Sequence, residues 1–116
     1  MDLKVNDYVR CTGSIGIRRA TDVIKNDKTQ EIEAFKDEKG ITIDLKYVLK
    51  YDKKPLNLIE KGDLVNGYII THEYIMSDGT IYQEGARFNR MIPLKNKDIK
   101  TFITHEQLES ISYKVK

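Results

Sequence analysis

The sequence predicts a mainly β fold made of two small barrel-type units in tandem, and two observations carry this prediction. The first is a repeated opening: residues 4–9 (KVNDYV) return as residues 60–65 (EKGDLV), so that Asp7 and Asp63 stand fifty-six positions apart. Each copy places turn-forming residues before apolar β-formers, which is typical of a tight turn that leads into a strand. The second is that short alternating segments, separated by Gly, Asn and Asp, recur along the chain.

The first unit is expected to span residues 1–54. Its five extended segments alternate apolar and polar side chains or are rich in β-formers. They are residues 8–12, 17–24, 30–35, 41–43 and 48–51. Turns are expected at residues 13–16, 26–28 and 37–40, with Gly40 at a positive φ. Residues 44–47 are expected to form a single helical turn before the last strand.

The second unit is expected to span residues 55–116, because Pro55 removes a backbone donor and restricts the residue before it. Asn66-Gly67 is a strong hairpin dipeptide. The expected extended segments are 68–76, its hairpin partner 81–83, then 87–94, 99–103 and 111–115. Thr104 and Gln107 have the spacing of a capping box, which predicts a short helix over residues 104–110.

Composition is that of an ordinary water-soluble domain. Of the 116 residues, 33% are charged and 40% hydrophobic. The longest apolar run, at residues 68–70, is too short to span a bilayer, and no leader signals secretion, so a membrane partner is not expected. Cys11 is the only cysteine and cannot form an internal disulfide, which favours a reducing cytoplasm. We expect Cys11 to be a small buried strand residue.

The net charge of +2 is too balanced for a dedicated nucleic-acid binder. Its distribution is uneven, since residues 60–84 are mainly acidic and residues 87–100 mainly basic. In a β-rich fold these two segments are expected to pair in one sheet and neutralise each other.

No catalytic constellation is found, so the protein is not expected to be an enzyme or to hold a cofactor or metal. Cys11, His72 and His105 lack the close paired spacing of structural zinc sites. We expect His72 to lie at the boundary of an apolar face and His105 to be solvated. Asp44-Leu45-Lys46 has the acid-x-lysine spacing of some metal-dependent nucleases, but no first acid lies on a neighbouring strand. A small metal-dependent hydrolase therefore remains only a remote alternative.

Three segments, residues 4–10, 56–68 and 98–115, resemble small proteins carried by phages and prophages of low-GC bacteria. The resemblance covers the start and most of the second half, but neither residues 15–51 nor residues 72–94. It brings no catalytic motif and no site residue. The family that the chain resembles has no assigned activity. Together with the short chain and its mixed charge, the resemblance leads us to expect a non-catalytic accessory protein in the cytoplasm of a bacterial host, which binds and inhibits a host nucleic-acid-targeting complex such as a CRISPR effector. The opening also resembles the first strand of an SH3-like or KOW-type barrel.

For a basic protein partner, the candidate contact surface is the acidic hairpin over residues 72–85. Aromatic side chains within a charged rim are the composition of a binding hot spot. The candidate contact residues are Glu73, Tyr74, Asp78, Tyr82 and Glu84. The alternative is structural, with Tyr74 and Tyr82 packed in the core as a cross-strand pair.

A KOW-like nucleic-acid-binding module is the competing function. Basic and aromatic residues are interleaved at residues 18–19, 50–54 and 87–90, as on a backbone-binding surface. The candidate contacts on this hypothesis are Arg87, Phe88, Arg90, Lys95 and Lys97. Solubility on a lysine-rich surface is the simpler explanation of the same pattern.

Overall fold

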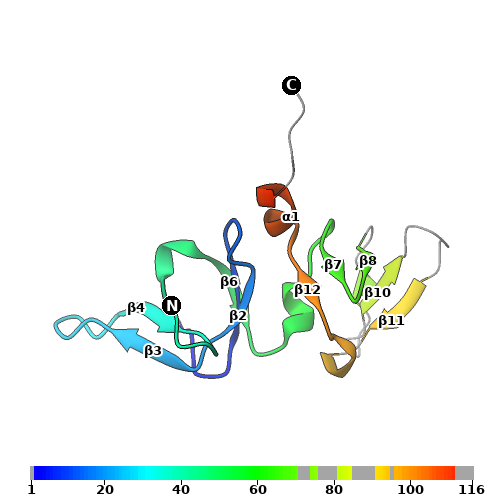
Figure 1. The fold of residues 1–116 in the computed structure, drawn as a ribbon. Helices are drawn as coiled ribbons and strands as arrows, with labels where there is room; N and C mark the ends of the chain where they lie inside the picture. The colour runs from blue at the N-terminus through cyan, green and yellow to red at the C-terminus, as the bar shows by residue number, and fades with distance from the viewer. Residues whose placement is uncertain (1, 71–73, 76–80, 85–90, 95, 112–116) are drawn as a thin grey trace.

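The predicted class is confirmed by a computed structural model, which describes residues 2–70, 74–75, 81–84, 91–94 and 96–111. In this part of the chain, twelve short strands and three 3-10 helices precede a single α-helix (Figure 1). The fold is therefore mainly β, with a short helix near the C-terminus. Closure of each half into an SH3-like barrel stays a prediction.

The first half contains two antiparallel three-stranded sheets, of order β2-β1-β6 and β3-β4-β5. A single 3-10 turn precedes its last strand, as predicted. The elements are β1 (Tyr8–Cys11), β2 (Ile17–Arg19), β3 (Asp22–Lys25), β4 (Ile32–Lys36), β5 (Thr42–Asp44), η1 (Leu45–Tyr47) and β6 (Val48–Asp52).

The second half repeats this plan after η2 (Pro55–Leu58). Its sheets have the orders β12-β7-β8 and β11-β10-β9, and again a 3-10 turn precedes the last strand. The elements are β7 (Leu64–Val65), β8 (Tyr68–Ile69), β9 (Tyr74–Ile75), β10 (Ile81–Glu84), β11 (Met91–Leu94), η3 (Asn96–Asp98), β12 (Phe102–Ile103) and α1 (His105–Ile111). The tandem relation thus extends well beyond the six repeated residues, while the division at 54/55 stays a prediction.

The two aspartate turns are equivalent, as the repeat predicts. Asp7 accepts a hydrogen bond from the Lys4 amide at 3.0 Å, and its own amide donates to the Lys4 carbonyl at 3.1 Å. Asp63 makes the same pair of bonds with Glu60, at 2.7 and 3.1 Å. In both turns the residue before the aspartate has a positive φ, 76° at Asn6 and 93° at Gly62.

Each half has its own hydrophobic cluster, and the repeat also places the core residues. The first cluster is centred on Val9 and Phe35, and the second on Val65 and Ile70; all four are fully buried. Val9 and Val65 occupy the same position relative to their turns, which is why the repeated sequence keeps an apolar β-former there. Cys11 is fully buried in the first cluster, as predicted, and burial raises the pKa of its thiol to about 11.

Two long strands predicted from the sequence are wrong in the same way. The segment 17–24 breaks at Ala20, whose amide donates to Asp7 at 2.8 Å, while the next amide, of Thr21, donates to Lys36 in the other sheet. The chain therefore changes sheet between these two residues. The segment 68–76 breaks at Ile70, whose amide donates to Asp63 at 2.8 Å, the bond equivalent to that of Ala20.

The capping box at the C-terminal helix is confirmed. The Gln107 amide donates to Thr104 Oγ1 at 3.1 Å, and the Thr104 amide donates to Gln107 Oε1 at 2.9 Å. A strand from residue 111 is wrong, because Ile111 is the last residue of α1; residues 112–115 lie outside the described part. No helix among the described residues is long and apolar enough to cross a membrane.

Candidate functional site

A fully buried arginine lies where the two halves meet. Arg10 is on the central strand β1, and its side chain reaches into the second half. Its Nη1 and Nη2 donate to the two carboxylate oxygens of Asp63 at 2.6 and 2.8 Å, and Nη1 also donates to the Leu58 carbonyl at 2.8 Å. A bidentate, fully buried pair of this kind fixes both distance and orientation.

Asp63 is the centre of four hydrogen bonds. Besides the two from Arg10, it accepts bonds from the backbone amides of Glu60 at 2.7 Å and His105 at 2.8 Å. Its side chain is fully buried. One carboxylate therefore closes its own turn, holds the first residue of α1 and neutralises the arginine of the first half.

An outer ring of charged groups surrounds this pair. Glu106 binds Arg10 Nη2 through Oε2 at 2.6 Å, and Glu60 Oε2 lies 3.3 Å from Arg10 Nε. Lys50 and His105 complete the ring: Lys50 Nζ is 3.0 Å from Glu60 Oε2, and His105 Nε2 is 3.1 Å from Glu60 Oε1. We refer to Arg10, Lys50, Glu60, Asp63, His105 and Glu106 as the Arg10 cluster.

In four members of the cluster, Arg10, Glu60, His105 and Glu106, the pKa is shifted toward the charged form. Burial lowers the pKa of Arg10, but the bonds to Asp63 and Glu106 outweigh burial and hold this pKa above its usual value. Burial raises the pKa of Glu60 and of Glu106, and the neighbouring cations reverse this, so that both values lie below the usual one. The bond to Glu60 raises the pKa of His105. The expectation that His105 is simply solvated is therefore wrong.

A second contact joins α1 to the first half. Gly16, in the turn between β1 and β2, has a φ of +74°, and a Cβ at this position would overlap the side-chain amide of Gln107. The same Gln107 side chain caps α1 through Thr104. A glycine is thus required here for its backbone conformation and for the space that it leaves.

Replacing Gly16 with alanine is expected to destabilise the protein more than the same replacement at Gly13. Both glycines have a positive φ, 74° and 59°, so the backbone strain is matched at about 1 kcal/mol. Only at Gly16 must the methyl group displace the Gln107 side chain, which removes its bond to Thr104 and adds about 1 kcal/mol. Urea unfolding of both variants measures the difference; equal losses would mean that α1 does not rest on this turn.

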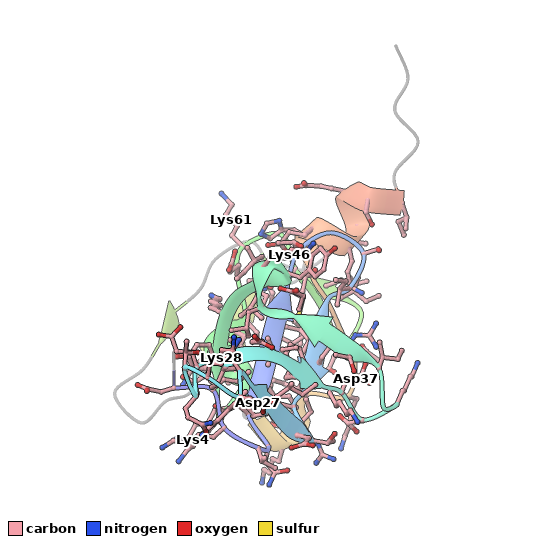
Figure 2. The ribbon with its side chains drawn as sticks, turned by 90° about the vertical axis from the view of Figure 1, so that its left-hand side faces the viewer. Lys4, Asp27, Lys28, Asp37, Lys46 and Lys61 are labelled. Carbon is pink, nitrogen blue, oxygen red and sulfur yellow. The ribbon has the colours of Figure 1, made fainter. Side chains whose placement is uncertain are left out.

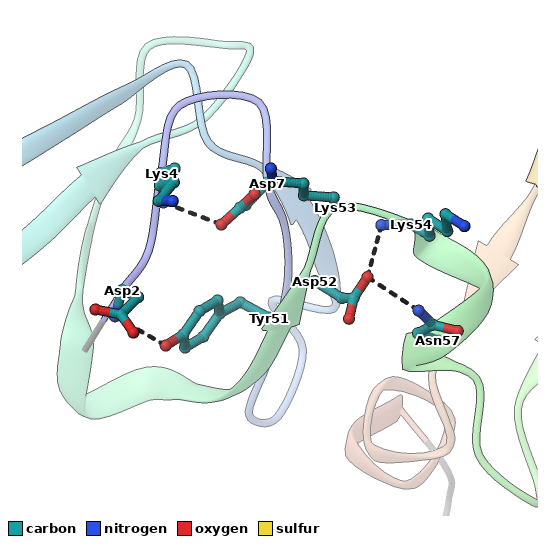
Figure 3. A pocket seen from close by; sticks show the side chains of 8 residues that line it. All are labelled: Asp2, Lys4, Asp7, Tyr51, Asp52, Lys53, Lys54 and Asn57. Atoms are coloured by element: carbon teal, nitrogen blue, oxygen red, sulfur yellow. Dashed lines mark hydrogen bonds between the residues drawn. The ribbon is translucent and has the colours of Figure 1, made fainter.

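The pocket in Figure 3 is a second candidate site, of about 390 Å³, beside the first aspartate turn. The Asp2 amide donates to the Tyr51 hydroxyl at 2.9 Å, and Asp7 accepts from the Lys4 amide. Asp52 accepts from the Lys54 amide at 2.8 Å. The Tyr51 hydroxyl and the carboxylates of Asp7 and Asp52 are thus used to hold the chain together, and the lining contains both acidic and basic side chains.

Several sequence-predicted site residues lie outside the described part of the chain. They are His72, Glu73, Asp78, Arg87, Phe88, Arg90 and Lys95. Tyr74 lies on β9, and both Tyr82 and Glu84 lie on β10; the register sets Tyr74 directly opposite Tyr82. The strand pairing of the predicted hairpin is confirmed for these residues, and its turn lies outside the described part. Lys97 is exposed in η3.

Backbone pairing of the acidic with the basic segment is confirmed where the structure describes both, while the mutual neutralisation of their charges stays a prediction. β10 runs antiparallel to β11, with Glu84 opposite Met91 and Ile81 opposite Leu94. The two stretches of opposite charge therefore contribute neighbouring strands to one sheet.

The basic segments of the first half are engaged in ion pairs. Arg18 Nη1 is 3.3 Å from Asp37, and Arg19 Nε is 3.5 Å from Glu38. The labelled lysines in Figure 2 are spread over the face shown, with Asp27 between Lys28 and Lys4 and with Asp37 at the right of the view. Lys46 follows Asp44, whose carboxylate accepts its amide at 2.9 Å to cap η1, which explains the acid-x-lysine spacing without catalysis.

The Arg10 cluster is the feature that sequence reasoning missed. Arg10 stands between Val9 and Cys11, and all three side chains are buried, so alternation along β1 gives no sign of it. One signal for the cluster is present in the sequence. Asp63 is the counterpart of Asp7 in a second β unit that is expected to pack against the first, so a cation of the first unit could be its partner. Comparison with protein-family models, curated proteins and solved structures finds no match to this chain.

Proposed function

We propose that this protein is a non-catalytic, phage-type accessory protein of the bacterial cytoplasm that binds and inhibits a host nucleic-acid-targeting complex, such as a CRISPR effector. The observation that carries the proposal is the antiparallel pairing of β9 with β10, which sets Tyr74 opposite Tyr82. The hairpin sequence adds Glu73, Asp78 and Glu84. Paired tyrosines with a charged rim have the composition of a protein-binding hot spot.

The charged groups of the Arg10 cluster support a binding role rather than catalysis. Arg10, Asp63 and Glu106 are bound to one another, so their charges stabilise the junction of the halves. The acidic hairpin, with strands β9 and β10, belongs to a different sheet from β7, the strand that directly follows the Asp63 turn. A rigid junction would hold such a hairpin ready for a partner without ordering it on binding.

We infer that the hairpin binds a basic groove of its partner. Carboxylates placed in a groove that normally holds phosphates compete with nucleic acid directly. The hairpin sequence offers only Glu73, Asp78 and Glu84, which favours blocking a limited surface or one conformational step over imitation of a whole duplex.

The inhibitor proposal predicts that Glu73→Lys combined with Glu84→Lys weakens the complex in a salt-dependent way. A pull-down from infected host lysate supplies the partner, and titration calorimetry with the purified partner then measures Kd. We expect at least a tenfold weaker complex at low salt, since two attractive charges become repulsive. The control is Glu31→Lys with Glu33→Lys, the same charge change at exposed positions of the first half. Equal affinity of both folded double variants would move the interface away from the hairpin.

Nucleic-acid binding is the competing proposal, and the same proteins test it. Two of its three basic segments contain cations that are paired, at Arg18, Arg19 and Lys50. If the KOW-like alternative holds, wild-type protein binds DNA or RNA with an affinity that falls steeply with salt, and Arg87→Ala with Arg90→Ala weakens it. Such binding, together with no host protein captured, would replace the inhibitor proposal.

A further inference from the structure

Three side chains with metal-binding atoms converge at the outer side of the Arg10 cluster. Glu60, His105 and Glu106 each offer one ligand atom, and these atoms lie within 4.8 Å of one another. His105 Nε2 is 3.1 Å from Glu60 Oε1 and 3.6 Å from Glu106 Oε1. Ligand atoms bound tetrahedrally to zinc at about 2 Å lie about 3.3 Å apart, so these two separations match such a site.

The carboxylate oxygens are divided between two tasks. Glu60 directs Oε2 to Arg10 and Lys50, and Glu106 directs Oε2 to Arg10 at 2.6 Å. Oε1 of each residue faces the imidazole, although Glu106 Oε1 also receives a long 3.4 Å bond from Arg10 Nε. Cationic partners on the far oxygen orient a ligating carboxylate in the way that outer-shell residues do in metal sites.

The imidazole has an outer-shell partner too. His105 Nδ1 lies 3.6 Å from Glu109 Oε1, one helical turn along α1. A ligating histidine usually directs its second ring nitrogen to a carboxylate, which fixes the ring and leaves Nε2 for the metal.

The charge of the group favours a divalent cation. The group contains two permanent cations, Arg10 and Lys50. Four carboxylates lie against these cations or against His105, and they belong to Glu60, Asp63, Glu106 and Glu109. With a neutral imidazole the carboxylates exceed the cations by two charges. The ligand side chains are neither buried nor fully exposed, at 36% for Glu60, 31% for His105 and 19% for Glu106, so an ion has access.

We propose that Glu60, His105 and Glu106 form a site for one divalent transition-metal ion, with zinc as the best match. One imidazole and two carboxylates suit zinc better than calcium or magnesium, which prefer oxygen ligands alone. Because Glu60 is the first residue of the Asp63 turn and the other two ligands begin α1, the ion would clamp the helix to the junction of the halves. Sequence spacing hides the site, since Glu60 and His105 are 45 positions apart.

Zinc titration of the full chain by calorimetry tests the site. Wild-type protein is expected to bind one zinc ion saturably, and His105→Gln to bind it at least about tenfold more weakly. This variant keeps the backbone amide that donates to Asp63 and the Thr104–Gln107 capping box, so it should fold; circular dichroism checks this. NMR of the wild-type imidazoles should show zinc bound to Nε2 of His105.

Two matched variants make the result specific. His72→Gln removes the only other histidine, and Glu31→Gln removes an exposed carboxylate of the first half; both should leave zinc affinity unchanged. Glu60→Gln should weaken binding as His105→Gln does. The proposal is overturned if wild-type protein shows no saturable binding up to about 1 mM zinc. It is equally overturned if His105→Gln binds as the wild type does, or if His72→Gln abolishes binding.

Discussion

Replacing Asp63 with alanine is expected to lower the free energy of unfolding by about 3–5 kcal/mol. Both side chains are fully buried in the native fold, so the change leaves the guanidinium of Arg10 buried without its bidentate partner. It also removes the acceptor of the Glu60 and His105 amides, so the turn and the start of α1 lose their anchor together.

Asp7 provides the matched control, because its turn is built in the same way. Asp7→Ala removes the acceptor of the Lys4 amide in a turn equivalent to that of Asp63, and is expected to cost about 1–2 kcal/mol. Urea unfolding followed by circular dichroism compares the two variants. The difference between the two losses in free energy of unfolding measures how much the bonds of Asp63 to Arg10 and His105 stabilise the protein beyond the turn itself.

Equal losses at Asp7 and Asp63 would contradict the role assigned to the buried pair. If the alanine variant of Asp63 does not fold, the asparagine pair keeps the experiment decisive. Asp63→Asn and Asp7→Asn both retain a side-chain oxygen for the turn, and only the first removes a charge that faces Arg10.

The features that the sequence predicted correctly have local causes. Asn66-Gly67 forms the hairpin turn between β7 and β8 because both residues adopt a positive φ, 51° and 82°, which few other residues tolerate. The capping box of α1 likewise depends on two residues three positions apart. The repeat itself predicted equivalent turns, and in both copies the aspartate exchanges its two bonds with the residue three positions earlier, which is a local interaction.

The features that it missed depend on distant partners. At Ala20 and Ile70 the chain leaves one sheet for another while its composition stays that of a strand, so periodicity runs on through the break. Arg10 has the alternation of a solvent-facing residue, yet its partners lie 48 to 96 positions away. Its burial follows from the packing of the second half, which local pattern does not contain.

Arg10→Met is expected to cost about 3–5 kcal/mol and to separate the unfolding of the two halves. The side chain is the one group of β1 that binds Asp63, the Leu58 carbonyl and Glu106 together. Each half has its own hydrophobic cluster, so cooperation between them depends strongly on this junction. Scanning calorimetry should show a single transition for the wild type, and a broadened or double transition at lower Tm for the variant.

Arg10→Lys distinguishes the charge from the geometry of the side chain. Lysine keeps the positive charge but lacks the planar fork that binds both Asp63 oxygens at once, so a loss of about 2 kcal/mol or more is expected. The control is Arg18→Lys, because the partly exposed Arg18 makes one 3.3 Å contact with the buried Asp37 and no bidentate pair, so a loss below about 1 kcal/mol is expected. If Arg10→Met unfolds in one transition at the wild-type Tm, apolar contacts alone would hold the halves together. If Arg10→Met lowers the free energy of unfolding and Arg10→Lys leaves it unchanged, the charge of the arginine stabilises the junction and its shape does not.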